Sequence, residues 1–293
     1  MTRITNGMMA GTVLADIENV YAQLAQTQER LSSGKQLTKP SDDPFATSRA
    51  LLYQAGLAAN KQYQANVDDG TAWLNATDTA LSQMHDDASR ARDLLLQGSN
   101  GTMTQTARDA IATELDQLAD SIKQAGNTQY AGRYVFGGMV TQTAPFTVGG
   151  ADTYAGDSGA VGRAIGDGVV IPINVTGDTV VTPLLAAIRQ AATDLRAGGN
   201  PTNLATTDLN ALDQATDGVT TTQAVVGART NRLASAASRL QELELAQTKQ
   251  LSDTEDADIA QTMIDYSSQS AVYQAALKAG ATLIQPSLID FLR

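Results

Sequence analysis

The stretch VLADIENVYAQLAQTQERLSSG, which covers residues 13–34, decides the fold. Its apolar positions alternate in steps of four and three, a spacing that places them on one stripe of a helix. The stripe consists of Val13, Ile17, Val20, Leu24, Thr27 and Leu31. Gly34 then supplies the left-handed residue that commonly ends a helix. Because a lone helix of this length is only marginally stable in water, the stretch predicts a helix that pairs with another helix.

The same spacing returns near the other end of the chain. There the stripe consists of Ile259, Met263, Tyr266, Ser270, Tyr273, Leu277, Gly280 and Ile284. We expect the two terminal helices to pair, either as a plain bundle within one chain or as seams that also assemble subunits. Beyond Pro286, which stops the helix, four residues would form an exposed apolar patch on a monomer. These residues are Leu288, Ile289, Phe291 and Leu292, and they favour assembly through both stripes and the patch.

Between the terminal stripes lie two long proline-free stretches, 45–144 and 202–285, and both have helical periodicity. One set of apolar residues repeats every seven positions: Val67, Leu74, Leu81, Ala88 and Leu95. A second set comprises Leu212, Val219, Val226, Leu233 and Leu240, flanked by Ala215, Ala236 and Leu243. A third helix, capped by Thr104, has an inner face of Ala107, Ile111, Leu115, Leu118, Ile122 and Ala125. Ser41 or Asp42 is expected to cap the helix that begins near Pro44.

The middle of the chain is rich in turns, because 14 of the 24 glycines fall between Gly126 and Gly199. Residues 169–176 alternate between apolar and other side chains with a period of two, which predicts a strand. Pro172 makes it an edge strand. Further candidate strands are 134–136 and 145–148. We expect a turn at Gly177-Asp178, followed by a short helix at 184–197.

The composition excludes several classes of function. The chain has 31 Asp+Glu against 20 Lys+Arg, a formal net charge of -11, which argues against binding nucleic acid or an anionic membrane surface. It has no cysteine, so disulfides, thiolate catalysis and cysteine-ligated metals are excluded. The sequence contains no apolar run long enough for a membrane span. Its first residues lack the apolar segment of a cleaved signal peptide, so we expect export by another route.

Candidate chemical sites are better explained by structure than by catalysis. Gly156-Asp-Ser158-Gly159 matches a protease nucleophile motif, but the only histidine, His85, lies in a predicted long helix beside its apolar stripe. The acidic run Asp253, Glu255, Asp256 and Asp258 lacks the pattern of a calcium loop and suits a helix N-terminus. Asp42-Asp43 is explained by capping. We therefore expect no enzyme activity, no catalytic residues, no cofactor and no metal.

Several motifs together resemble the bacterial flagellin family. In the first half they are Leu31-Ser-Ser-Gly-Lys35, Ser41-Asp-Asp-Pro44 and Arg90-Ala-Arg-Asp-Leu-Leu95, with Gln97, Asn100-Gly-Thr102, Arg108, Glu114 and Asn127-Thr128. In the second half they are Asn231-Arg-Leu233 and Glu255-Asp-Ala-Asp258. The resemblance covers 1–146 and 203–293. Within the family, Pro40-Ser-Asp-Asp-Pro44, Gly132-Arg-Tyr-Val-Phe-Gly137 and Thr143-Ala-Pro-Phe146 resemble the branch that joins hook to filament, whereas the ending Asp290-Phe-Leu-Arg293 keeps flagellin itself as an alternative.

The resemblance implies a mainly α fold: a long antiparallel coiled-coil helical bundle formed by the N- and C-terminal flanks, with a small β-rich domain inserted in the middle. We expect coiled-coil assembly segments at 1–44 and 253–293, and a helical rod formed by 45–138 and 184–252. The β-rich outer domain is expected at 139–183.

The resemblance also implies a structural protein at the hook–filament junction of the bacterial flagellum. Such a protein is exported unfolded through the flagellar type III apparatus, with an export chaperone, and folds outside the cell on assembly. The implied partners are hook-associated protein 1, flagellin and copies of the chain itself in a ring. Two other classes remain to be tested: another secreted type III coiled-coil structural protein, and an enzyme.

Overall fold

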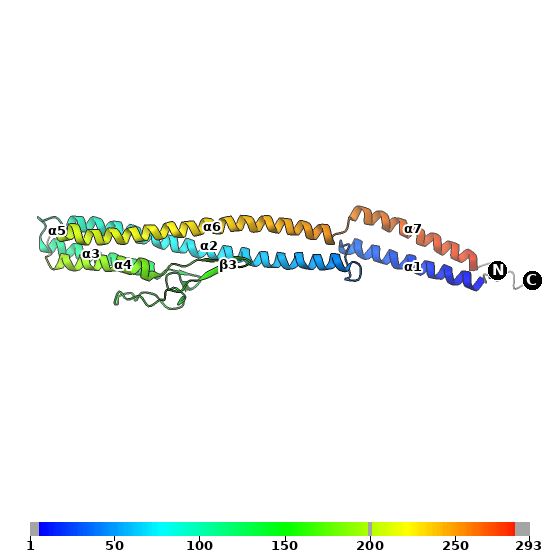
Figure 1. Ribbon diagram of the computed structural model, residues 1–293, viewed down its shortest axis with the longest axis horizontal. Coiled ribbons are helices and arrows are strands. Elements are labelled where there is room, and N and C mark those ends of the chain that lie inside the picture. Colours follow the sequence, from blue (N-terminus) through cyan, green and yellow to red (C-terminus); the bar gives the residue numbers. More distant parts are fainter. Residues whose placement is uncertain (1–5, 199–200, 285–293) are drawn as a thin grey trace, which may run out of the picture. The chain divides into compact units, whose positions relative to one another are not determined.

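The computed structural model describes residues 6–198 and 201–284, and the chain forms two compact units. The first unit combines Met1–Ala59 with Glu244–Arg293, and the second is Asn60–Leu243. Two helices contribute residues to both units: α2 (Pro44–Gly98) and α6 (Leu209–Glu255). The mainly helical fold with small antiparallel sheets is the predicted fold class (Figure 1).

In the first unit, helices α1 (Asn6–Ser33) and α7 (Ile259–Ile284) lie side by side and run antiparallel (Figure 1). Near one end Thr27 donates a hydrogen bond of 2.7 Å to the side-chain oxygen of Gln269. Further along, the rings of Tyr21 and Tyr273 lie 5.8 Å apart between centroids. The predicted stripe of α1 lies at this contact, because its six members are the half-buried or buried positions between residues 13 and 31: Val13, Ile17, Val20, Leu24, Thr27 and Leu31, together with Arg30.

The predicted stripe of α7 is only partly right. Tyr266, Ser270, Tyr273 and Gly280 are buried or half-buried on the α1 side, but Ile259, Met263 and Leu277 are exposed. Thr262 and Ala276 take their places at the contact. Apolar residues lie around the whole circumference of α7, including Ile264 and Val272, so spacing alone does not select one stripe. The backbone of Ile284 ends α7, whereas Leu288, Ile289, Phe291 and Leu292 lie outside the described residues.

Two short linkers connect this helix pair to the neighbouring ends of α2 and α6. The first follows Gly34, which ends α1 with a φ of 69°, as predicted. The linkers pair through a single β-bridge between Lys35 and Asp256. The amide of Gln36 donates to the carbonyl of Glu255 at 2.7 Å, and the Lys35 ammonium forms an ion pair with the Glu255 carboxylate. The two linkers are therefore held together locally.

The second unit has a continuous apolar core between α2, α3 (Gln105–Gly126), α4 (Gly177–Arg196) and α6. Every member of the two predicted sevenfold sets is buried: Val67, Leu74, Leu81, Ala88, Leu95, Leu212, Val219, Val226, Leu233 and Leu240. Thr104 caps α3 as predicted, accepting from the amide of Ala107. Leu243 is exposed, so its predicted place beside the core was wrong. The short α5 (Pro201–Asn203) and the π-helical turn η1 (Leu204–Asp208) lead into α6.

Two small hairpins stand between α3 and α4. The first pairs β1 (Gln129–Tyr130) with β2 (Arg133–Tyr134), and the second pairs β3 (Gly162–Gly166) with β4 (Val169–Pro172). The strand predicted at 169–176 is thus shorter, and the strand predicted at 134–136 lies largely beyond β2. The stretch 145–148 is not a strand, because Phe146 forms only one bridge, to Tyr154.

The helix predicted at 184–197 begins seven residues earlier, so the turn expected at Gly177-Asp178 was wrong. Pro183 lies inside α4 and removes one backbone hydrogen bond. Val180 and Val181 are buried in the core, and this burial holds the first turns of the helix in place. The non-helical segment between α3 and α4 is therefore 127–176.

Candidate assembly surface

The first unit has almost no apolar core of its own. Among its described residues the only buried hydrophobic side chains are those of Ala46 and Ala50, whereas the largest buried side chains all lie in the second unit. Burial of small alanine side chains contributes little, since the hydrophobic free energy scales with the apolar area removed from water. The α1–α7 pair is therefore held by a thin contact that includes the polar residues Thr27 and Thr262.

Exposed apolar side chains concentrate in the same unit. Of the 19 large hydrophobic side chains exposed among the described residues, 12 belong to it. They are Met8, Leu14, Tyr21, Phe45, Leu51, Leu52, Leu245, Ile259, Met263, Ile264, Val272 and Leu277. A high density of exposed apolar side chains makes this unit the candidate interaction surface of the chain. We call this set the assembly surface.

The structure divides the predicted seam residues between two roles. Residues of α1 that face α7 are Val13, Ile17, Val20, Leu24 and Leu31, and from α7 Tyr266 and Tyr273 face α1. Ile259, Met263 and Leu277 are exposed instead and belong to the assembly surface. The sequence could have indicated that α7 is apolar on more than one face, because its outward residues Ile264 and Val272 are as apolar as its predicted stripe.

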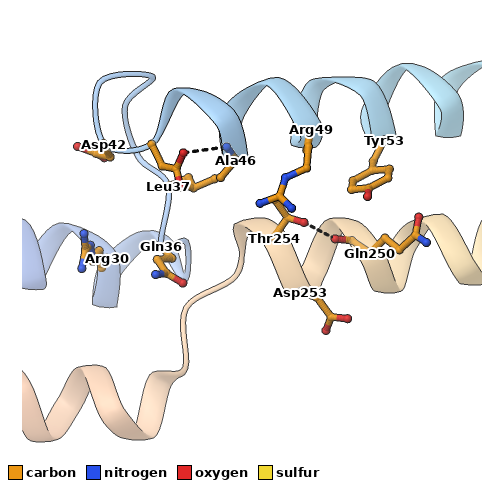
Figure 2. Close-up of a pocket in the computed structure, with 11 residues that line it drawn as sticks. Arg30, Gln36, Leu37, Asp42, Ala46, Arg49, Tyr53, Gln250, Asp253 and Thr254 are labelled. Carbon is orange, nitrogen blue, oxygen red and sulfur yellow. Dashed lines mark hydrogen bonds between the residues drawn. The ribbon is translucent and has the colours of Figure 1, made fainter.

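A polar cavity of about 540 Å³ lies within the first unit, where the linker after α1 passes the last turns of α6. Arg30 borders it from α1, Arg49 and Tyr53 from α2, and Gln250 and Thr254 from α6. Figure 2 shows the side chains of Arg49 and Tyr53 directed from α2 toward α6. Sequence reasoning did not identify this cavity, since it is assembled from segments that are about 200 residues apart.

The two adjacent aspartates beside this cavity, Asp42 and Asp43, accept hydrogen bonds from backbone amides. Asp43, rather than the predicted Ser41 or Asp42, caps α2, because its carboxylate accepts from the amides of Phe45 and Ala46 at 2.9 Å. Asp42 instead accepts from the amides of Lys39 and Thr38. The hydrogen bond from the Lys39 amide is the main cause that lowers the pKa of Asp42.

The acidic run before α7 also has structural partners. Asp258 caps α7, accepting from the amide of Gln261 at 3.1 Å, as the helix N-terminus interpretation predicts. Glu255 pairs with Lys35 and accepts from Gln54. Within 6–198 and 201–284, no group of three or more His, Asp or Glu side chains is arranged to hold a metal ion.

The histidine and the glycine-rich serine occupy structural positions. His85 is half-buried between Met84 and Ala88, at the flank of the α2 stripe, as predicted. Next to Ser158, the carboxylate of Asp157 accepts hydrogen bonds from the amides of Met139 and Gly159. These bonds stabilise a turn, so the glycine-rich motif has a structural explanation. None of the hydrogen bonds found among the described residues joins His85 to Ser158.

An ionic network in the second unit was not predicted. Lys123, on α3, is fully buried, forms an ion pair with Asp152 and donates to the carbonyl of Gly150 at 2.7 Å. Arg189, on α4, binds the same Asp152 together with Asp116 and Asp120. Burial opposes the charge of Arg189, but its three carboxylate partners raise the pKa. The network fastens the loop around residue 150 to α3 and α4.

The comparisons with known proteins agree with the helical flanks. The bacterial flagellin N-terminal helical region matches residues 4–141, and the bacterial flagellin C-terminal helical region matches residues 209–292. The chain belongs to the bacterial flagellin family. Its two matched regions include α1, α2, α3, α6 and α7, and they leave β3, β4 and α4 between them.

Within the flagellin family, hook-associated proteins match over nearly the whole length of the chain. The chain is 30% identical to flagellar hook-associated protein 3 of Escherichia coli (strain K12) over 305 aligned residues, covering 94% of this chain and 95% of that protein. The solved structure of Bacillus cereus FlgL has a TM-score of 0.60 and 26% identity, covering 69% of this chain and 99% of that one. Flagellin of Clostridium tyrobutyricum matches only 43% of this chain and 33% of its own length, at 29% identity.

These findings identify the chain as a member of a family of flagellar structural proteins and make flagellin the more distant match. No helix in the described part of the chain is both long enough and apolar enough to cross a membrane.

Proposed function

We propose that this protein is a structural subunit of the bacterial flagellum that joins the hook to the flagellin filament. The observation that carries the proposal is the contrast between its two units: the second buries a full core, while the first leaves the assembly surface open. Similarity over nearly the whole length of hook-associated protein 3, rather than to the terminal regions of flagellin alone, supports the junction role over the filament role.

In this role the chain acts through binding and not through catalysis. We propose that it has no enzyme activity, cofactor or metal, and that it binds neither nucleic acid nor membrane. Its partners are hook-associated protein 1 on one side, flagellin on the other and further copies of itself in a ring. The apolar residues of the assembly surface contact these neighbours, and Leu288, Ile289, Phe291 and Leu292 of the carboxy-terminal tail contribute to the same contacts.

We further propose that the protein is an extracellular component of the flagellum that leaves the cell unfolded through the flagellar type III export apparatus, bound beforehand by an export chaperone. The thin α1–α7 contact supports this, because a segment with little core of its own folds when neighbours bury its surface.

A deletion strain tests the function directly. Without this protein, cells should build intact hooks, fail to retain filaments and release flagellin into the medium, and the wild-type chain should restore filaments. Normal filaments in the deletion strain would refute the junction role.

Two pairs of substitutions test the assembly surface. Ile264 and Val272 on α7 are 62% and 51% exposed, and Val148 and Val170 in the second unit are 57% and 58% exposed. We expect Ile264→Ser with Val272→Ser to leave the melting temperature of the purified chain unchanged but to release flagellin. Val148→Ser with Val170→Ser removes matched apolar area and should support normal swimming. Equal behaviour of the two pairs would show that α7 has no special part in assembly.

A further inference from the structure

The turn between α2 and α3 contains an asparagine followed by a glycine, Asn100 and Gly101, and both residues are exposed. Gly101 has no side chain that hinders the approach of its main-chain nitrogen to the side-chain carbon Cγ of Asn100. Within the described part of the chain, the amide of Gly101 donates no hydrogen bond, and neither does the side-chain nitrogen Nδ2 of Asn100. A nucleophile and a leaving group therefore lie next to each other, and neither is held by another contact.

The side-chain oxygen of Asn100 is held by two donors of a single residue. It accepts a hydrogen bond of 3.1 Å from the amide of Thr102 and one of 3.0 Å from the hydroxyl of Thr102. The bond from the amide two residues ahead folds the side chain back over its own backbone. Attack on Cγ would place negative charge on this oxygen, and donors at such distances stabilise a developing oxyanion. The turn thus holds the reacting groups close together and activates the side-chain carbonyl.

We propose that Asn100 is a site of spontaneous covalent modification, at which the nitrogen of Gly101 attacks Cγ of Asn100 and the side-chain nitrogen is lost as ammonia. The Gly101 nitrogen gives its proton to hydroxide or water and forms a bond to Cγ. The bond between Cγ and Nδ2 breaks, and Nδ2 leaves as ammonia with a proton taken from water. The product is a cyclic imide. One water molecule then opens the imide by breaking one of the two bonds between its carbonyl carbons and the Gly101 nitrogen.

The surroundings of the main-chain carbonyl of Asn100 favour one direction of opening. This carbonyl accepts from the amide of Met103 at 3.1 Å and from the guanidinium of Arg108 at 3.4 Å. Attack of water on the main-chain carbon turns the carbonyl into a carboxylate, which these donors stabilise through charge-assisted hydrogen bonds. The chain then continues through the side chain of residue 100, as isoaspartate, whereas opening at Cγ gives aspartate. We therefore expect isoaspartate as the main product, with one additional negative charge.

Incubation of the purified full-length chain at pH 8 tests the reaction. Peptide mapping by mass spectrometry follows residue 100 over time, and an isoaspartate-specific methyltransferase distinguishes isoaspartate from aspartate. We expect isoaspartate to form in the folded chain at least as fast as in the same chain unfolded in guanidinium chloride, because the turn already presents the reacting atoms. A slower rate in the folded chain would overturn the proposal. Aspartate without isoaspartate would also overturn it, because that outcome indicates direct attack by water on the side chain.

Two substitutions test the roles of the neighbouring residues. Gly101→Ala places a methyl group beside the attacking nitrogen and should remove most of the isoaspartate. The φ of Gly101 lies outside the left-handed region, so the backbone of the turn is compatible with alanine. Thr102→Val removes the hydroxyl donor, keeps the amide donor and should lower the rate severalfold. Circular dichroism verifies that each variant is folded, and a wild-type rate in either folded variant would refute the role assigned to that residue.

An internal control separates this site from general loss of side-chain amides. Asn75 is also exposed, but it lies within α2 and is followed by Ala76. We expect Asn75 to remain unchanged in the same samples of the folded chain. Conversion of Asn75 at the rate of Asn100 would show that exposure alone explains the reaction, and the special role of the turn would be refuted.

Discussion

Replacing Asp208 with Asn removes a buried negative charge from the turn that leads into α6. Asp208 ends η1 and is 4% exposed, and its Oδ2 atom is buried without a hydrogen-bond partner. Burial, together with the smaller effects of the charge and the hydrogen bond of the neighbouring Asp194, raises the pKa of Asp208 to about 6. Gln190 donates to Asp194 at 3.0 Å, and within 6–198 and 201–284 neither carboxylate of the pair forms an ion pair with a cation.

The sign of the pH dependence follows from this raised pKa. The folded chain holds the proton of Asp208 up to about pH 6, whereas the unfolded chain releases it near pH 4. Between these values the folded state binds more protons, so its stability falls as the pH rises. A shift of about two pKa units corresponds to about 3 kcal/mol, which is lost in full above pH 6.

We expect Asp208→Asn to stabilise the second unit at pH 8 by up to about 3 kcal/mol and to change little at pH 4. For a unit of this size the gain corresponds to a rise in melting temperature of roughly 6–12 °C. Thermal unfolding followed by circular dichroism at both pH values measures it. Asp217→Asn, at an exposed position of α6, is the control and should shift neither curve. A variant that is no more stable than wild type at pH 8, or equally stabilised at both pH values, would refute the reasoning.

Three further predictions concern packing and assembly. Lys123→Ala leaves Asp152 and the Gly150 carbonyl short of a buried partner and should destabilise the second unit by about 3–5 kcal/mol in urea unfolding, whereas the exposed Lys61→Ala should have no effect. Gly280→Leu should weaken the α1–α7 pair, because even a Cβ atom there would lie 3.3 Å from Ile17 and 3.4 Å from Val13. We expect faster proteolysis of α1 with an unchanged melting temperature, and an unchanged rate of proteolysis would contradict the prediction. Removing 286–293 should leave the melting temperature of the monomer unchanged yet abolish retention of filaments, and normal swimming of the truncated strain would disprove a role for the tail.

The helices that could be predicted from the sequence are those with one apolar stripe. The sevenfold sets of α2 and α6 and the stripe of α1 all lie at helix contacts, because polar residues fill the other faces and leave one orientation. For α7 the stripe assigned from residue spacing was wrong at Ile259, Met263 and Leu277, which are exposed. Other apolar residues, such as Ile264 and Val272, make several orientations of this helix nearly equivalent.

Other features depend on contacts that local patterns do not encode. The strand β3 contains Gly162, Ala164 and Gly166, so it has no clear alternation, and it forms because it pairs with β4. The Lys123 network joins α3 to a loop about 30 residues away and could not be read from spacing. The cavity is likewise formed by segments from opposite ends of the chain.

The weak core of the first unit has an energetic consequence for assembly. Burying one large apolar side chain contributes about 1.5–3 kcal/mol, so a contact that covers two or three residues of the assembly surface yields only several kcal/mol. Association of two proteins costs about 4–15 kcal/mol in lost translational and rotational freedom. One such contact in solution is therefore too weak to hold two copies together, whereas a place on a preformed flagellar end offers several contacts for a single loss of freedom. We expect ordering of the first unit to follow the same rule, because each neighbour that covers α7 also stabilises its contact with α1. The proposed export as separate chains and the proposed incorporation at the growing end are both consistent with this distribution of apolar residues.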